Sequence, residues 1–262
     1  MSKRYFITSD VHSFFDELMV ALYKNGFDEN NPDHILCVCG DLFDRGDRTV
    51  ALFQFIKGLQ AQGRFIYIRG NHEDLLVDCM SEIECGMVPS PHHFFNKTVK
   101  TICHFCGEDE WIVYDPVWRK KICTIMRPVL EWIEQSCVDY FQIGDYILCH
   151  GWLLHCDGSQ DLKNASEDDW KRARWENGME QWRYPKYRMG GKTVICGHFH
   201  CSYGWSHIRM KRKEFPKKNR KDWEKSFEPF VDDGIIAVDS CCAYSGLLNC
   251  IVLNGQDDFM EE

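Results

Sequence analysis

Residues 34–46 read HILCVCGDLFDRG: an apolar run ends in glycine and is followed directly by Asp41, Asp44 and Arg45. Apolar runs of this length, bounded by glycine, are typical of buried strands. Similar runs stand on either side, with helix-type apolar spacing between them. This strand–helix alternation predicts βαβ units, parallel strands and an α/β fold class. The predicted strands are 4–8, 34–40 and 64–70, and the predicted helices are 13–25 and 47–62.

Polar side chains follow each of these strands, and two later apolar runs, 145–151 and 193–200, also end in histidine. Ligands bind at the carboxyl ends of strands in open α/β sheets, so we expect these side chains to converge. Carboxylates and imidazoles suit borderline divalent ions such as Mn²⁺, Fe²⁺ or Zn²⁺. The set comprises Asp10, His12, Asp41, Asn71, His72, His150, His198 and His200.

The remaining segments are less regular. Two helix-like stretches open with proline, at Pro91 and Pro128, and they indicate a helical, cap-like insertion at about 81–143. The apolar runs 234–240 and 247–254 predict a closing hairpin. We find no clear linker, so we predict a single domain over residues 1–262.

Composition excludes several classes of protein. The net charge of −9 argues against a nucleic-acid partner, because such proteins usually carry a basic excess. We find no apolar leader and no apolar stretch near the roughly 20 residues that cross a membrane. The 15 cysteines lie mostly in apolar runs and indicate buried, reduced thiols. We therefore expect a cytoplasmic protein with no membrane partner.

The motifs DVH (10–12), GDLFDRG (40–46), GNHE (70–73), HG (150–151) and GH (197–198) together resemble the calcineurin-like metallophosphoesterases. GDLFDRG with GNHE is similar to the phosphoprotein phosphatase branch, in its bacterial and phage form. The resemblance covers nearly the whole chain. It implies a four-layer αββα sandwich with a dinuclear metal site at the carboxyl ends of the strands.

The resemblance also implies roles for individual residues. Two divalent ions, foremost Mn²⁺ with Fe²⁺/Fe³⁺ or Zn²⁺ as alternatives, would supply a metal-bound hydroxide as the nucleophile. His72 would be the general acid, Asp44 would orient it, and Arg45 would bind the phosphate together with Asn71. The implied first-metal ligands are Asp10 and His12, the bridging ligand is Asp41, and the second-metal ligands are Asn71, His150 and His198.

Two assignments rest on departures from the family pattern. Asn177 stands where related sequences often have a phosphate-binding arginine, and Arg174 is our substitute, with Arg183 and Arg188 behind it. His200 follows His198 by two residues, so in a continuing strand both would point to one face. We therefore predict that His200 completes the shell of the first metal. A polar residue without a metal bond is the alternative.

The substrate stays open. We expect a phosphomonoesterase acting on phosphoserine or phosphothreonine in proteins, or on a small phosphoester. The alternative enzyme is a nucleotide hydrolase similar to the symmetrical diadenosine tetraphosphatases, and the alternative of another class is a non-catalytic binding module. The basic stretch 211–221 is a solvated loop or a recruiter of acidic substrates.

Overall fold

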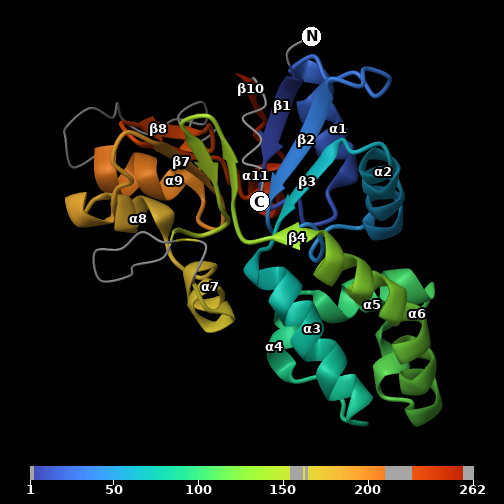
Figure 1. Cartoon of the computed structure of the whole chain (residues 1–262). Coiled ribbons are helices and arrows are strands. Elements are labelled where there is room, and N and C mark those ends of the chain that lie inside the picture. Colours follow the sequence, from blue (N-terminus) through green and yellow to red (C-terminus); the bar gives the residue numbers. More distant parts are fainter. Residues whose placement is uncertain (1–2, 154–161, 163–164, 210–225, 256–262) are drawn as a thin grey trace.

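Two five-stranded sheets form the centre of the molecule (Figure 1). The structure is a computed structural model that describes residues 3–153, 162, 165–209 and 226–255. The strand order is β10-β1-β2-β3-β4 in the first sheet and β5-β6-β7-β9-β8 in the second. The strands are β1 Lys3–Thr8, β2 His34–Cys39, β3 Phe65–Ile68, β4 Cys137–Val138, β5 Phe141–Ile143, β6 Tyr146–Leu148, β7 Thr193–Cys196, β8 Phe230–Asp232, β9 Ile235–Ala237 and β10 Ile251–Gly255.

The first sheet is parallel from β1 to β4, as the alternation of elements predicts. Successive side chains of a strand point to opposite faces, and here both faces are covered. Phe6 and Leu36 lie in the core beneath the helices. Ile7 and Cys37 lie in a separate core that also contains Ile195 of the second sheet. The two sheets therefore pack against each other.

Helices cover the outer face of each sheet. The cluster on the first sheet includes Leu18 and Leu22 of α1 (Phe15–Lys24) and Leu52 of α2 (Thr49–Ala61). The cluster on the second sheet includes Met179 and Trp182 of α8 (Gly178–Trp182). These layers confirm the predicted αββα sandwich. Further helical segments are α7 Glu167–Ala173, η3 Pro185–Tyr187, α9 Cys201–Tyr203, η4 Gly204–Arg209 and α11 Cys242–Ser245.

Helices α3 to α6 lie together beyond the lower end of the first sheet in Figure 1. A helix does begin at Pro91, but the predicted start at Pro128 is wrong, because Pro128 lies inside α6. That helix starts at Pro116, where Asp115 accepts hydrogen bonds from the main-chain nitrogens of Val117 and Trp118. The group comprises α3 Asn71–Glu84, α4 Pro91–Phe95, α5 Thr98–Cys106, η1 Glu110–Val113 and α6 Pro116–Ser136.

The boundaries of the insertion also differ from the prediction. The interval 81–143 includes β4 and β5, which belong to the two sheets. The helices between β3 and β4 instead span residues 71–136, beginning at the GNHE motif itself. The single-domain assignment of residues 1–262 stays a prediction.

The predicted closing hairpin is wrong. Strand β9 pairs with β7 and β8 in the second sheet, whereas β10 pairs antiparallel with β1 in the first sheet. The two apolar runs thus occupy different sheets, because each sheet has a place for only one of them. No helix in the described part of the chain is long and apolar enough to span a bilayer.

Candidate metal and phosphate site

The predicted site residues come together at the carboxyl ends of strands from both sheets. Several of them adopt a left-handed backbone, which costs an L-residue roughly 1–2 kcal/mol. Strain of this kind tends to collect at functional sites. The non-glycine residues with positive φ include Asp10, His12, Asp41, Asp44, Arg45 and His198.

The loops of the site pack very closely. Gly40 has φ of +80°, and a Cβ there would lie 2.3 Å from Nδ1 of His150. A Cβ on Gly197 would lie 1.6 Å from Oγ of Ser9. Glycine in GD and GH is therefore required by the approach of one loop to another.

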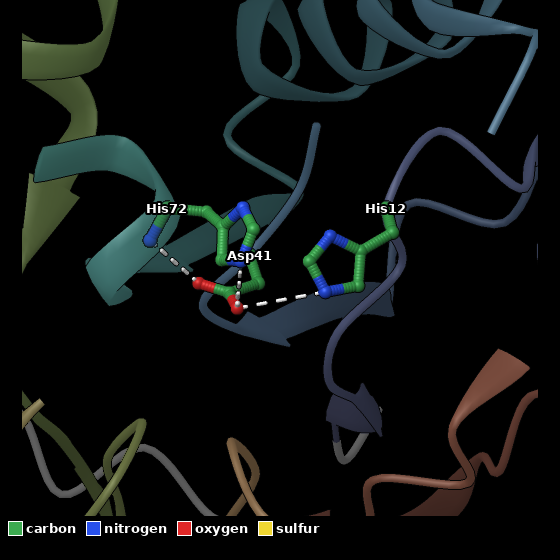
Figure 2. Close-up of side chains that lie close together, drawn as sticks. All are labelled: His12, Asp41 and His72. Carbon is green, nitrogen blue, oxygen red and sulfur yellow. Dashed lines mark hydrogen bonds and ion pairs between the residues drawn. The ribbon is translucent and has the colours of Figure 1, made fainter. Parts of the chain in front are cut away.

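Figure 2 shows the first cluster, formed by His12, Asp41 and His72. Oδ2 of Asp41 lies 3.6 Å from Nε2 of His12 and 3.9 Å from Nε2 of His72. The other carboxylate oxygen accepts a hydrogen bond of 3.0 Å from the main-chain nitrogen of His72. Asp41 thus faces two imidazoles from different loops.

A second cluster joins Asp41 to His150 and His198. Nε2 of His150 lies 2.9 Å from Oδ1 of Asn71 and 3.3 Å from Oδ1 of Asp41. In each cluster the candidate ligand atoms lie within 4.8 Å of one another, and Asp41 belongs to both. A carboxylate suits such a shared position because each of its two oxygens has more than one lone pair.

The hydrogen bonds of His12 and His150 indicate which ring nitrogen of each would face a metal. Nδ1 of His12 lies 2.7 Å from the carbonyl oxygen of Phe43, and Nδ1 of His150 lies 2.8 Å from that of Cys39. Donation from Nδ1 leaves Nε2 with a lone pair. Nε2 of His12 is buried without a hydrogen-bond partner. Nε2 of His150 hydrogen-bonds Oδ1 of Asn71, and although burial lowers the pKa of His150, Asp41 and Asp10 outweigh it and raise that pKa, so this imidazole would release a proton on binding a metal. The residues present therefore fit a divalent metal.

The electrostatics agree. Burial, with further contributions from neighbouring imidazoles, lowers the pKa of His12 well below its usual value and that of His198 to about 3. Both side chains are then neutral, the form that binds metal. Burial also raises the pKa of Asp41 to about 6, although His150 and His72 oppose this. A bound cation would favour the ionised carboxylate instead.

Asp10 falls outside both clusters in the part of the chain that the structure describes. Its Oδ2 accepts hydrogen bonds from the Ser9 hydroxyl and, at 3.0 Å, from the main-chain nitrogen of His198. Asp10 therefore links the first and second sheets at the site, and its role as a ligand stays a prediction.

His72 is held by Asp44 and faces Arg45. Its Nδ1 lies 2.6 Å from Oδ2 of Asp44, and its Nε2 lies 3.3 Å from Nη2 of Arg45. Burial lowers the pKa of His72, but Asp41 and Asp44 outweigh it and raise the pKa to about 9. The arrangement can present a protonated imidazole and a guanidinium group to one anion.

Two threonines of α5, which the sequence analysis did not single out, hold Asp44. The Thr101 hydroxyl donates to Oδ1 of Asp44 at 2.6 Å and accepts from its main-chain nitrogen at 2.9 Å. The Thr98 hydroxyl donates to Oδ2 at 3.1 Å. Lys100 donates to the carbonyl oxygen of Arg45 at 2.9 Å. The helical insertion therefore fixes the GDLFDRG loop.

Glu73 stabilises the segments that follow β2 and β3 by accepting hydrogen bonds from their main-chain nitrogens. Oε2 accepts from the main-chain nitrogens of Asp41 and Gly70, at 3.0 and 2.8 Å, and Oε1 accepts from that of Leu42 and from the Tyr67 hydroxyl. Both oxygens are thus in use. Glu73 therefore acts as a structural partner of these loops.

The geometric argument for His200 does not hold. Strand β7 ends at Cys196, His198 has φ of +64°, and α9 begins at Cys201. His200 is therefore not on a continuing strand. Its side chain is 46% exposed, with Nε2 4.0 Å from Oδ2 of Asp239, and neither cluster includes it. Metal ligation by His200 stays a prediction.

Arg174 is placed in an ion-pair cluster instead of beside a phosphate. Nη1 donates to Asp74 at 2.8 Å and to Glu167 at 3.2 Å, and Nη2 donates to Asp139 at 2.6 Å. The side chain is 3% exposed. The donors expected for a phosphate are thus already committed to carboxylates, so we correct this assignment to a structural one.

The neighbouring candidates for phosphate binding are also engaged elsewhere. Arg183 pairs with Glu180 at 2.8 Å, and Nε of Arg188 donates to the carbonyl oxygen of Trp182 at 2.9 Å. Asn177 caps α8 by accepting from the main-chain nitrogen of Glu180. The stretch 211–221 lies outside the described residues.

Asp239 is a site residue that the sequence analysis missed. It follows β9, is 3% exposed, and its Oδ1 accepts from the main-chain nitrogen of Cys241. Burial, together with the charge of Asp10, raises its pKa well above the usual value. The rule that polar residues collect at strand ends would have found it in IIAVD, which we had assigned to a hairpin.

Comparisons with known proteins agree with this geometry. The family model for calcineurin-like phosphoesterases matches residues 3–202. A 74-residue stretch, 26% of the chain, is 35% identical to the asymmetrical bis(5'-nucleosyl)-tetraphosphatase PrpE of Bacillus subtilis (strain 168) and covers 30% of that protein. An 80-residue stretch, 30% of the chain, is 34% identical to the symmetrical bis(5'-nucleosyl)-tetraphosphatase of Buchnera aphidicola subsp. Baizongia pistaciae (strain Bp) and covers 27% of it.

Among solved structures, a cold-active protein-tyrosine phosphatase of a psychrophilic Shewanella species superposes with a TM-score of 0.51. The sequence identity is 14%, and the superposition covers 97% of this chain and 76% of the other. This likeness concerns the fold.

Proposed function

The chain belongs to the calcineurin-like phosphoesterase family, and we propose from this premise that it is a dinuclear-metal-dependent phosphoester hydrolase. The observation that carries the proposal is that the Asp41 carboxylate lies within 4.8 Å of the candidate ligand atom of His12 and also of those of His150 and His198. A carboxylate shared between two ions is a typical arrangement for in-line displacement at phosphorus.

The residues present would hold two divalent ions, which when bound polarise the phosphoryl oxygens and activate the attacking water. The buried, unpartnered Nε2 of His12 supports this. Manganese is our first choice, with iron or zinc as alternatives. The proposed ligands are Asp10, His12, Asp41, Asn71, His150, His198 and, as the most exposed candidate, His200.

The chain's own residues would bind and protonate the substrate. Arg45 offers planar donors to the phosphate oxygens, and we assign the Asn71 amide to assist it. With Nδ1 donating to Asp44, His72 carries a proton at Nε2 only as the imidazolium, the form that Asp41 and Asp44 favour against burial. We assign His72 as the general acid that delivers this proton to the leaving oxygen.

Two substrate classes remain as candidates. Phosphorylated proteins follow from the motif resemblance to the phosphoprotein phosphatases. Dinucleoside polyphosphates are favoured by the relatives, which are named bis(5'-nucleosyl)-tetraphosphatases and share 34–35% identity with part of the chain. The matched stretches cover less than a third of those relatives, so neither class is carried over whole.

Adding metal back to stripped protein tests the proposed activity. We expect hydrolysis of p-nitrophenyl phosphate only after Mn²⁺, Fe²⁺ or Zn²⁺ is restored, and its loss in Asp41→Asn. Hydrolysis that is insensitive to chelation would contradict the metal mechanism. A folded, metal-binding protein with no activity on any phosphoester would favour the non-catalytic binding module.

A further inference from the structure

An aromatic cleft adjoins the second cluster of candidate ligands. It has a volume of about 580 Å³, within the range usual for small-molecule sites. Its walls come from the loop between α7 and α8, from the loop after β7 and from α9 with η4. The lining residues are Trp175, His198, Phe199, His200, Ser202, Tyr203, Ser206 and His207.

The rings of the cleft form a continuous series. Trp175 meets the ring of His198 edge to face, with centroids 5.8 Å apart, and Phe199 meets that of Tyr203 at 6.1 Å. Tyr203 stacks on His207 at 4.5 Å, with an angle of 15° between the planes. The series therefore includes His198, a candidate metal ligand, and continues from it through Phe199 and Tyr203 to His207.

Two of the rings keep much of their surface uncovered. Trp175 is 52% exposed and Phe199 is 37% exposed. A large indole beside a polar site is a suitable platform for a planar group, since stacking needs only a free face. Ser202 and Ser206 belong to the same lining, where the Ser206 hydroxyl donates to the carbonyl oxygen of Ser202 at 2.6 Å.

We propose that this cleft is the binding site for the purine base of a nucleoside phosphate whose phosphate lies at the metal clusters. Continuity through His198 places the cleft directly beside the reacting group, as such a substrate requires. The relatives named for dinucleoside polyphosphates favour a base over the phenyl ring of a phosphotyrosine. This inference rests on the proposed function for the position of the phosphate.

A binding experiment tests the cleft without hydrolysis. Calorimetric titration of the Mn²⁺-loaded protein compares AMP, inorganic phosphate and phenyl phosphate. We expect AMP to bind about 5- to 100-fold more tightly than phosphate, the gain that base stacking on an aromatic ring provides. Equal binding of AMP and phosphate, or of AMP and phenyl phosphate, would overturn the proposal.

Variants of the lining residues test whether the tighter binding of AMP comes from the cleft. Trp175→Leu and Tyr203→Leu should reduce the preference for AMP over phosphate to about twofold or less, and Trp175→Phe should retain most of it. The dissociation constant for phosphate, measured on each variant, reports whether the metal clusters are intact. Trp111→Leu is the matched control, because Trp111 is 49% exposed but lies in η1, away from the cleft lining. An undiminished preference in both leucine variants would refute the assignment.

Kinetics separate this inference from the proposed activity. The ratio of kcat/KM for diadenosine tetraphosphate to that for a phosphoserine peptide should fall at least about tenfold in Trp175→Leu, in proportion to the lost stacking. If Trp175→Leu hydrolyses both substrates with an unchanged ratio of kcat/KM, the base-binding role of the cleft is refuted and the proposed activity is not. If the protein binds AMP preferentially but hydrolyses no phosphoester, the proposed activity is refuted and the base-binding role of the cleft is retained.

Discussion

Replacing Thr101 with valine tests whether the helical insertion positions the general acid. Valine has nearly the same shape as threonine but lacks the hydroxyl. The change removes a 2.6 Å hydrogen bond to the carboxylate of Asp44 and leaves the main-chain nitrogen of Asp44 without its 2.9 Å acceptor. Thr101 is 1% exposed, so water does not readily replace either bond.

The magnitude follows from these two contacts. A hydrogen bond to a charged group contributes about 1.5–3 kcal/mol, and a buried unsatisfied N–H costs about 1–3 kcal/mol. Thr98 and His72 still hold Oδ2 of Asp44, so the loop keeps part of its order. We expect a loss of roughly 3 kcal/mol in the free energy of unfolding, less than the full sum because neighbouring terms are not additive.

The effect on catalysis should appear in kcat. Misplacing a catalytic group by about 1 Å can lower the rate 100-fold, and we expect a reduction of about 10- to 100-fold in Thr101→Val. The assay measures kcat and KM for p-nitrophenyl phosphate and for an alkyl phosphate, whose poorer leaving group depends more on the acid. The alkyl substrate should therefore suffer more, while KM changes little.

Two variants complete the test. Thr101→Ser keeps the hydroxyl and should restore most of the rate. Thr124→Val removes an exposed hydroxyl that donates to Lys120 within α6, and it should change neither stability nor kcat by much. Equal losses for both substrates in Thr101→Val, or a rate not restored by serine, would refute the positioning role.

Three further outcomes are expected. His72→Asn should lower kcat about 100- to 10,000-fold for alkyl phosphates and far less for p-nitrophenyl phosphate, and equal losses in stopped assays would refute its role as the acid. Arg174→Met should lower the free energy of unfolding by about 2–3 kcal/mol in urea titrations, because buried Asp74 keeps only Arg69 as a partner and half-buried Asp139 loses a hydrogen bond to a charged group. Arg172→Met, with a 77% exposed side chain, should cost at most about 1 kcal/mol. A rise in KM without loss of stability would instead support Arg174 as a phosphate-binding residue. Chelation should lower the thermal midpoint, and Mn²⁺ at 100 times its dissociation constant should restore about 2.7 kcal/mol; an unchanged midpoint would argue against structural coupling of metal and fold.

The sequence predicted the sandwich and most of the cluster because the signals are local. Each strand is an apolar run of a few residues, and each polar motif follows its strand directly, as with Asp41 after β2. The carboxyl ends of parallel strands then bring the motifs together without further information. Asp239 was missed only because its strand had been assigned to a hairpin.

The errors concern contacts between distant segments. The partners of Arg174 come from residues 74, 139 and 167, and no spacing in the sequence brings these together. The expected strand geometry at His200 is absent for a local reason instead, because the chain turns at His198, where a positive φ ends the extended backbone, and its metal ligation stays a prediction. The hairpin failed because β9 pairs with β7 and β8 and β10 pairs with β1, and the partner of a strand is not encoded in its own apolar run.

The sheets position most of the proposed metal ligands, whereas the helical insertion orients the general acid, so the two functions can change separately. The proposed metal ligands follow strands or, for Asn71, begin α3, whereas the acid is oriented by Asp44 and, through it, by Thr98 and Thr101 of α5. Lys97, directly before α5, adopts φ of +68°, so this helix starts from a strained position. A perturbation of α5 should therefore alter protonation of the leaving group before it alters metal affinity, because the hydroxyls of Thr98 and Thr101 bond to Asp44 and act on His72 only through it.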